Sequence, residues 1–309
     1  MPDYESLRQI TPLAGVVLAN NPGMMSLEGT NTWILRDEPG RRSAVVIDPG
    51  PDSDEHRGAV LDAAGSVELI LLTHGHIDHS EGARRMHEVT GAPVRALDPA
   101  HRYGTEGLGE GDTIEAAGVR IDVWSTPGHT SDSLSFVLPA AQSGAQSPSE
   151  AMAEAAAADT PLAVLTGDTI LGRGTTVVSY PDGVLEDYLN SLNRLAVLDG
   201  VSLLPGHGPE LVDAGAVARQ YLAHREQRLD QVRQALLNAR GNLTPRQVVK
   251  RVYADVDKAL WPAAELSVRA QLTYLRAHGM PDVGLEGWRR FGLLRRLSER
   301  GGPTARGRG

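Results

Sequence analysis

The stretch LILLTHGHIDHSEG, residues 69–82, joins an apolar run directly to a dense group of polar side chains. The group contains His74, His76, Asp78 and His79, so three imidazoles and a carboxylate stand within six residues. Burying such groups together costs free energy unless they share a ligand or a charge partner. The preceding run is short and rich in Leu and Ile, which is typical of a buried strand that ends where the polar group begins.

Three further polar groups also follow short apolar runs, and each contains glycine beside a histidine or an aspartate. They are TPGHT, which contains His129, TGDT, which contains Asp168, and PGHG, which contains His207. Side chains at the carboxyl ends of strands in layered α/β folds converge on one edge of the sheet. We therefore expect these three residues to join the first group, with the glycines allowing sharp turns and close backbone approach.

Five imidazoles and two carboxylates are too many ligands for one tetrahedral ion but suit two adjacent ions. The chain has no cysteine, whereas a structural zinc site usually closes with four ligands that are often thiolates. Imidazole favours Zn, Fe, Ni or Cu over Mg or Ca, so two divalent metal ions, most often zinc, are expected. A hydroxide bridging two such ions would be the nucleophile of a hydrolase. The remaining histidines are expected to be ordinary packing residues: His56, His87, His101, His224 and His278.

Short apolar segments alternate with helical patterns, which predicts an α/β layered domain over residues 1–214. The Ala/Ser/Pro-rich segment 139–161 is predicted to be a flexible insertion within it. Beyond residue 214 the pattern is helical, with Thr244 as a cap for one helix, and predicts a small helical domain over 215–300. Residues 301–309 are predicted to form a disordered Gly/Arg tail.

Charge is distributed unevenly along the chain. The net charge is −9, yet the part from Tyr221 onward holds 17 Lys and Arg against 8 Asp and Glu. This basic excess fits an anionic partner, or equally a solvated arginine-rich helical surface. No window approaches the roughly 20 apolar residues of a membrane span, and the N-terminus lacks the features of a signal peptide. We expect a cytoplasmic protein without a membrane partner.

THGHIDH followed in order by PGHT, GD and PGHG resembles the metallo-β-lactamase superfamily, and the resemblance covers residues 15–210. It implies a four-layer αββα sandwich with a dinuclear metal site at one edge. Position by position, it implies that one metal is held by His74, His76 and His129, and that the second is held by Asp78, His79 and His207. It also implies that Asp168 bridges the two metals and that Asp48 supports the metal-binding loop from behind.

The segments NNPGMMSLEGTNTWIL, GDTILGRGTTV and HREQR are similar to the β-lactamase-like protein 2 branch, which carries a C-terminal winged-helix-like module. This similarity implies an endoribonuclease acting on single-stranded RNA, as for the animal members. Glyoxalase II enzymes share the seven ligands, so a thioester or small-ester hydrolase is the alternative. Lactamases that use a cysteine ligand are excluded by composition.

Residue roles follow from these expectations. Asp78 and Asp168 are the expected catalytic carboxylates, and no leaving-group acid can be assigned. Asn31 in EGTNT and Arg173 in GRGTTV are candidate substrate contacts, although each also fits an ordinary turn or surface loop. A binding module with a vestigial metal site is the alternative from another class. The helical module can also cover the site or form a homodimer contact.

Overall fold

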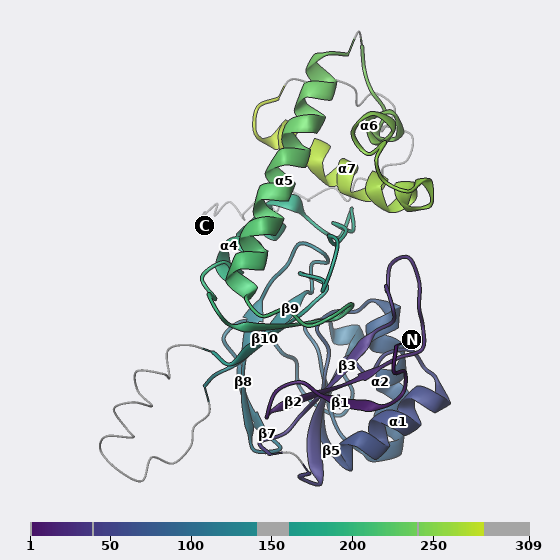
Figure 1. Ribbon diagram of the computed structural model, residues 1–309, viewed down its shortest axis with the longest axis vertical. Helices are drawn as coiled ribbons and strands as arrows, with labels where there is room; N and C mark the ends of the chain where they lie inside the picture. Colours follow the sequence, from purple (N-terminus) through teal and green to yellow (C-terminus); the bar gives the residue numbers. More distant parts are fainter. Residues whose placement is uncertain (1, 39, 141–160, 240, 281–309) are drawn as a thin grey trace, which may run out of the picture.

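The computed structural model describes residues 2–38, 40–140, 161–239 and 241–280. Two β-sheets pack face to face, helices cover their outer faces, and a helical module follows the second sheet (Figure 1). The predicted four-layer αββα sandwich and the small helical domain after it are therefore confirmed. The predicted insertion 139–161 lies outside the described residues except at its two ends, and the predicted tail 301–309 lies outside them entirely.

The first sheet has six strands in sequence order, parallel from β4 to β6 and antiparallel before that. Alternation along β4 explains its continuous apolar sequence, because Val45 and Ile47 face the core between the sheets while Ala44 and Val46 face the covering helices. The strands are β1 (Leu7–Gln9), β2 (Ala14–Leu18), β3 (Asn31–Leu35), β4 (Ser43–Ile47), β5 (Ser66–Leu71) and β6 (Val94–Arg95).

The second sheet has five strands in the order β11-β10-β9-β8-β7, in which β10 and β11 are parallel and the other pairs antiparallel. Its inner face contributes Ile121 and Phe136 to the core between the sheets, and its outer face carries a second apolar cluster. The strands are β7 (Thr113–Ala116), β8 (Val119–Ser125), β9 (Leu134–Leu138), β10 (Ala163–Gly167) and β11 (Ser202–Pro205).

Two helices cover the first sheet, α1 (Asp54–Ala64) and α2 (Ile77–Thr90), and a short η1 (Pro99–His101) follows β6. Helix α2 starts within the histidine motif, with His76 as its N-cap. Asp78 and His79 therefore lie in the first helical turn, which fixes their direction relative to the preceding loop.

Helices α4 (Leu185–Leu195) and α5 (Ala214–Leu237) cover the second sheet. Helix α5 begins next to the predicted domain boundary at 214 and belongs to both parts, because its second half packs in the helical module. The module continues with α6 (Pro245–Val252), η2 (Lys258–Leu260) and α7 (Trp261–Ala277). Thr244 caps α6 as predicted, in a reciprocal capping box with Gln247. In the described parts of the chain, no helix has the length and apolar character needed to span a membrane.

Candidate metal centre

The seven predicted ligands come together where the strands of both sheets end. His74 and His76 occupy the loop after β5, and Asp78 and His79 the first turn of α2. The other three follow strands of the second sheet: His129 after β8, Asp168 after β10 and His207 after β11. Residues separated by more than a hundred positions thus share one site, as strand-end convergence predicts.

One group consists of three histidines, His74, His76 and His129, whose candidate ligand atoms all lie within 4.8 Å of one another. Nδ1 of His76 and Nε2 of His129 are 3.0 Å apart. Two nitrogen ligands on one tetrahedral zinc ion stand about 3.3 Å apart, given Zn–N bonds of about 2.0–2.1 Å. The spacing of this group is therefore suited to one ion.

A second group consists of Asp78, His79 and His207, again with ligand atoms within 4.8 Å of one another. Nε2 of His79 lies 3.2 Å from Nε2 of His207, which in turn lies 3.1 Å from Oδ2 of Asp78. Asp168 stands between the groups: its Oδ2 is 3.7 Å from Nε2 of His129 and 3.6 Å from Nε2 of His207. This carboxylate lies within reach of both groups.

Two buried polar atoms of the centre lack a hydrogen-bond partner among the described residues, Nε2 of His74 and Oδ1 of Asp168. A buried acceptor without a partner is costly, and native proteins satisfy nearly all such groups. Both atoms belong to the cluster of candidate ligands. Orphaned nitrogen and oxygen donors at ligand spacing fit a pair of divalent ions.

Hydrogen bonds on the far side of the imidazole rings orient them. Nδ1 of His79 donates to Oδ2 of Asp48 over 2.8 Å, Nδ1 of His129 to the Val177 carbonyl over 2.7 Å, and Nδ1 of His207 to the Gly29 carbonyl over 3.0 Å. Each bond leaves the Nε2 lone pair directed at the cluster, as in metal-bound histidines generally.

Asp48, at the end of β4, supports the loop as well as His79. Its Oδ1 accepts the backbone N–H of Thr73 over 2.8 Å, and its Oδ2 accepts the Thr73 hydroxyl over 2.7 Å. Since that hydroxyl proton is directed at Asp48, the Thr73 oxygen accepts Nδ1–H of His74 over 3.1 Å. This leaves Nε2 of His74 as the free nitrogen.

The pKa values of the cluster divide into two sets. Burial and the neighbouring imidazoles lower the pKa of His74 well below its usual range, and burial lowers the pKa of His129 to about 4. Burial also opposes charging of His79 and His207, but nearby carboxylates, Asp168 foremost, outweigh it and raise the pKa of both. The imidazoles in turn overcome burial and hold the pKa of Asp168 well below that of an ordinary carboxyl.

Close backbone approach requires glycine at two positions beside the ligands. A Cβ on Gly206 would lie 2.7 Å from both Oδ1 of Asp168 and Cε1 of His79. Gly128 has a φ of +135°, and a Cβ there would lie 2.3 Å from Cα of Tyr188. The glycines of PGHG and TPGHT are thus needed for the ligand cluster to close.

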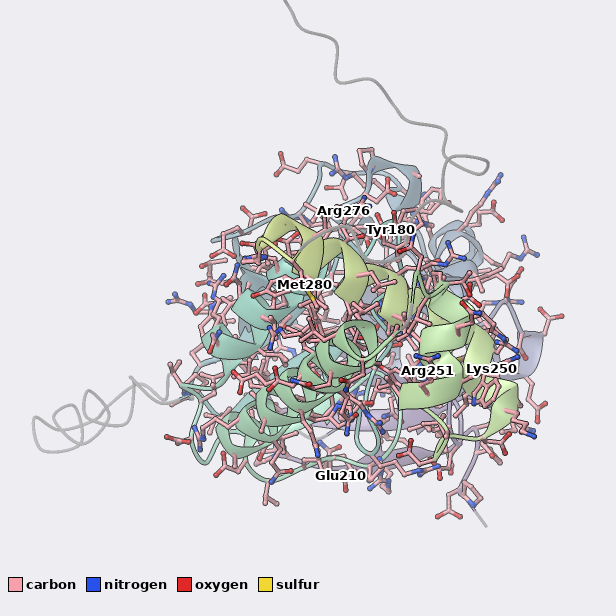
Figure 2. The ribbon with its side chains drawn as sticks, turned by 90° about the horizontal axis from the view of Figure 1, so that it is seen from above. Tyr180, Glu210, Lys250, Arg251, Arg276 and Met280 are labelled. Carbon is pink, nitrogen blue, oxygen red and sulfur yellow. The ribbon has the colours of Figure 1, made fainter. Side chains whose placement is uncertain are left out.

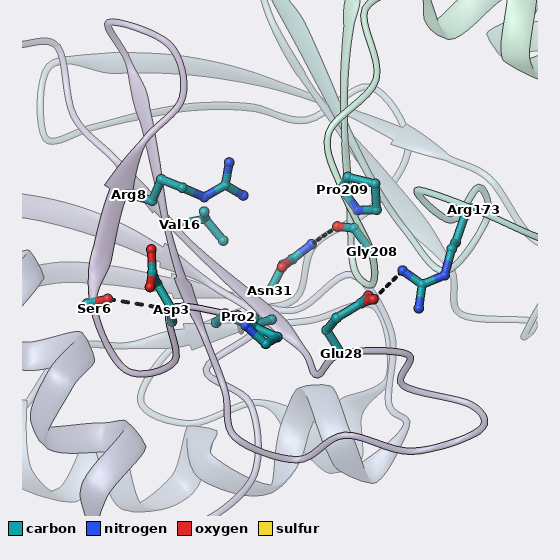
Figure 3. Close-up of a pocket in the computed structure, with 11 residues that line it drawn as sticks. Pro2, Asp3, Ser6, Arg8, Val16, Glu28, Asn31, Arg173, Gly208 and Pro209 are labelled. Atoms are coloured by element: carbon teal, nitrogen blue, oxygen red, sulfur yellow. Dashed lines mark hydrogen bonds and ion pairs between the residues drawn. The ribbon is translucent and has the colours of Figure 1, made fainter.

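The two predicted substrate contacts lie together beside the His207 turn (Figure 3). The Asn31 side chain is buried, and its Nδ2 donates to the carbonyls of Pro205 and Gly208, so both amide protons hold the turn. Arg173 forms an ion pair with Glu28 across a pocket of about 410 Å³. Asn31 thereby has a role in positioning His207 that the sequence did not reveal.

His224 and Arg225 of α5 are residues that the sequence did not assign to the site. Both line a cavity that His129 and Asp168 also line, and both have a buried nitrogen without a hydrogen-bond partner among the described residues. They belong to the HREQR segment, where helical spacing favours a packing role. The packing of α5 near the loop after β10 brings these two residues to the cavity, and sequence spacing alone does not show this.

Comparisons with known proteins agree with this architecture. Residues 25–144 match the Metallo-beta-lactamase superfamily, and residues 244–280 match the Beta-lactamase associated winged helix domain. The chain is 30% identical over 286 residues to the Beta-lactamase-like protein 2 homolog of Drosophila melanogaster, covering 85% of this chain and 87% of that protein.

Two further similarities are to a protein named as a thioesterase and to a solved structure. The chain is 26% identical over 271 residues to the Atrochrysone carboxyl ACP thioesterase of Aspergillus fumigatus, covering 82% of this chain and 77% of that protein. A solved beta-lactamase domain protein from Burkholderia ambifaria aligns with a TM-score of 0.71 at 20% identity, covering 90% of this chain and 91% of that one, and it supports the fold. The chain therefore belongs to the metallo-beta-lactamase superfamily of metal-dependent hydrolases, with a beta-lactamase-associated winged-helix domain after the catalytic fold.

Proposed function

We propose that the chain is a two-metal hydrolase in which His74, His76 and His129 hold one ion, Asp78, His79 and His207 hold the other, and Asp168 bridges them. The observation that carries this proposal is the pair of ligand groups, each within 4.8 Å, with Asp168 between them. When bound, two such ions act as Lewis acids and lower the pKa of a coordinated water to about 7. Zinc is the preferred ion because the donors are imidazole nitrogen and carboxylate oxygen.

The side chains of the cluster differ in their access to solvent. The Asp78 side chain is 27% exposed, whereas that of Asp168 is 11% exposed and those of His79 and His207 are almost fully buried. Asp78 is therefore the carboxylate that can accept a hydrogen bond from an incoming water and orient its oxygen toward the substrate. Asp168 and the buried imidazoles keep their positions and define the electrostatic environment.

An RNA phosphodiester is one candidate substrate. Lys250 and Arg251 are exposed on α6, and Figure 2 shows them close together at one side of the molecule. However, several arginines of the helical module are already paired, as Arg228 is with Asp255 and Arg269 with Glu265. The basic excess read from the sequence thus leaves fewer free cations on the described surface than the residue count implies.

An ester or thioester is the candidate that the geometry supports better. The cavity that shares His129 and Asp168 with the ligand cluster has a mainly apolar wall of aliphatic and aromatic side chains, which suits an acyl compound more than a polyanion. One similar protein is named as a thioesterase, which is consistent with this candidate. We therefore propose carbonyl carbon as the electrophile, with phosphodiester hydrolysis second.

A substrate panel tests the proposal. Metal-loaded protein is incubated with an acyl-glutathione thioester, a single-stranded RNA and a lactam, and its metal content is measured in parallel. We expect thioester cleavage that is lost in His76→Ala and Asp168→Asn but retained in Asp52→Asn, whose exposed carboxylate pairs with Arg57. RNA cleavage with the same dependence on His76 and Asp168 would establish the second candidate instead. Full activity of either ligand variant would refute the two-metal assignment.

A further inference from the structure

A cavity of about 320 Å³ extends from the candidate metal centre toward the helical module. His129 and Asp168 line one end, and residues of α5, α7 and the segment between α6 and α7 line another part. A ligand that fills this cavity can therefore reach the candidate metal centre. The volume falls at the lower end of the roughly 300–1,000 Å³ found for small-molecule sites.

Aliphatic and aromatic side chains form most of the wall on both sides of the cavity. The helical module contributes Tyr253, Val256, Leu260 and Ala264, and the segment after β10 contributes Leu171 and Val177. Such a wall gains free energy by removing apolar surface from water and offers little to an extended charged ligand. Its composition fits an apolar group of the substrate.

The cations of the wall are already engaged. Arg225 is buried, donates to the Thr176 carbonyl and places its guanidinium 5.0 Å from the centre of the Tyr188 ring. Arg173 pairs with Glu28. Burial and the charges of Arg225 and Arg228 lower the pKa of His224, so its imidazole is neutral near pH 7. A phosphodiester chain would lose hydration along this wall and could gain only the guanidinium of Arg225 as a charge partner, which is unfavourable for an extended polyanion.

Hydrogen-bonding capacity remains at two nitrogen atoms of the wall, Nδ1 of His224 and Nε of Arg225, which have no partner among the described residues. Each can form a hydrogen bond with an oxygen atom of an otherwise apolar ligand. Met24 and Met25, whose side chains also line the cavity, are 52% and 50% exposed. Exposed methionines are unbranched and adaptable, a property used at binding surfaces that accept ligands of varied shape.

We propose that this cavity holds the apolar acyl group of the substrate, so that the chain is specific for esters or thioesters of medium-length acyl groups, a specificity that rests on the hydrolase function proposed above. Water adds to the acyl carbon, the C–S or C–O bond breaks, the leaving thiolate or alkoxide takes up a proton, and a carboxylic acid and a thiol or alcohol are released. Ala264 of α7 and Met25 of the loop between β2 and β3, which both line the cavity, are the specificity determinants.

Binding of the acid product tests the cavity without requiring turnover. Metal-free full-length protein is titrated with acetate, octanoate and dodecanoate by calorimetry. We expect affinity to rise from acetate to octanoate, by about fourfold for each methylene that becomes buried. Affinity that does not depend on acyl length would overturn the proposal.

Two variants locate the binding. Ala264→Phe places a ring in the cavity, and Met25→Asp places a charge on its exposed wall, where loss of fold is not expected. Each should weaken octanoate binding at least tenfold and leave the far-ultraviolet circular dichroism unchanged. The control Val212→Asp changes an apolar residue that is 86% exposed and does not line the cavity, and it should bind octanoate normally. Unchanged octanoate affinity in Met25→Asp and in folded Ala264→Phe would contradict the assignment.

Turnover by metal-loaded protein separates failure of this inference from failure of the proposed function. If octanoate binds with the expected variant pattern but no acyl thioester is hydrolysed, the acyl cavity stands and the hydrolase proposal fails. If acetyl and octanoyl thioesters are hydrolysed equally well and the acids bind equally, the hydrolase proposal stands and the acyl cavity is refuted. Faster hydrolysis of the octanoyl thioester, reduced in Met25→Asp, would support both.

Discussion

Asp48 holds two ligand-bearing segments together with a single carboxylate. It accepts both the backbone N–H and the hydroxyl of Thr73, which precedes His74, and it accepts Nδ1–H of His79 in α2. Its own backbone has a φ of 52°, a left-handed conformation that costs a non-glycine residue about 1–2 kcal/mol. The cost is offset by the hydrogen bonds that this conformation allows the buried carboxylate to make.

Replacing Asp48 with Asn should therefore weaken metal binding more than it weakens the fold. The amide has one acceptor oxygen, so it cannot accept from Thr73 and His79 as the carboxylate does, and the ring of His79 loses its orientation. We expect metal affinity to fall about 10–100-fold, the usual effect of removing such a supporting partner. Competition with a metal chelator measures it. The matched control Asp52→Asn, four residues on and exposed, should bind metal normally; equal affinities in the two variants would contradict the role of Asp48.

The two ligand groups should release their ions at different pH values. A histidine binds metal only when deprotonated, so protons compete first at imidazoles whose pKa is raised. Carboxylates raise the pKa of His79 and His207, whereas burial lowers that of His129 to about 4 and that of His74 well below its usual value. As pH falls below the ordinary histidine pKa of about 6.5, the ion held by His79 and His207 should leave before the other.

Elemental analysis of desalted samples at stepwise lower pH should show the metal content falling from two ions to one per chain before the last ion is lost. Controls held at neutral pH should keep both ions through the same desalting. Loss of both ions in one step, or earlier loss from the site of His129, would show that the pKa difference does not govern release. Repeating the series with His207→Ala, which lacks a ligand of the second group, shows the pH at which the ion of the His129 group is lost.

Among the elements, those with long apolar runs were predictable and those with exposed sequences were not. Most of β4 and the second half of β5 are buried, and both strands are rich in Val, Ile and Leu, so an apolar pattern marks them together with the polar group after β5. Strand β1 consists of three exposed residues, and β7 is only four residues long, too short for a clear alternation of buried and exposed positions. Neither strand can therefore be distinguished from a loop by its sequence. Their pairing with β2 and β8 defines them as strands.

The residue at which α2 starts could not be predicted from the sequence, for a different reason. The histidine motif has no side-chain cap, because His76 makes no capping hydrogen bond, and its polar residues resemble a loop. Helical geometry nevertheless begins at Ile77, where the turn directs Asp78 and His79 to the ligand cluster. The sequence could therefore single out the candidate ligand residues, while their local conformation depends on tertiary contacts such as the bond from His79 to Asp48.

Helix α4 packs against the His129 loop so closely that Gly128 should not tolerate a side chain. In Gly128→Ala, the new Cβ would lie 2.3 Å from Cα of Tyr188, so either the loop or α4 must move. We expect a loss of more than about 2 kcal/mol in the free energy of unfolding, from overpacking and from the unfavourable φ. Metal affinity should fall as well, because His129 moves with the loop.

Urea titration and chelator competition measure these two effects. Gly91→Ala is the matched control, because Gly91 also has a positive φ, +73°, but its Cβ would meet no atom within 4 Å. It should lose about 1 kcal/mol and bind metal normally. A Gly128 variant no less stable than the Gly91 variant would show that the α4 contact yields without cost.

At the scale of the molecule, the helical module and the catalytic sandwich share one apolar core. The cluster on the outer face of the second sheet runs through α4 and α5 into α6 and α7, with members such as Leu203, Leu192, Leu229, Val248 and Val268. Hydrogen bonds also cross between the parts, from Leu171 N–H to the Tyr221 hydroxyl and from Val178 N–H to Ser267 Oγ. The cavity beside the metal centre arises from this junction, which brings together residues more than 200 positions apart, and for that reason no local pattern in the sequence could reveal it.

A shared core predicts that the two parts unfold together. Trp33 is buried between the sheets, and Trp261 begins α7, where its Nε1 donates to the Val256 carbonyl. Variants that keep one of these tryptophans and replace the others with Phe report on the sandwich and on the module separately. Urea unfolding followed by the fluorescence of each variant should give coincident midpoints, and circular dichroism should agree, as in two-state unfolding. Since each variant is compared with its own circular dichroism curve, small stability changes from the replacements do not affect the comparison. If the Trp261 signal instead changes at clearly lower urea, the module unfolds by itself, and the junction that forms the cavity is weaker than its continuous apolar core implies.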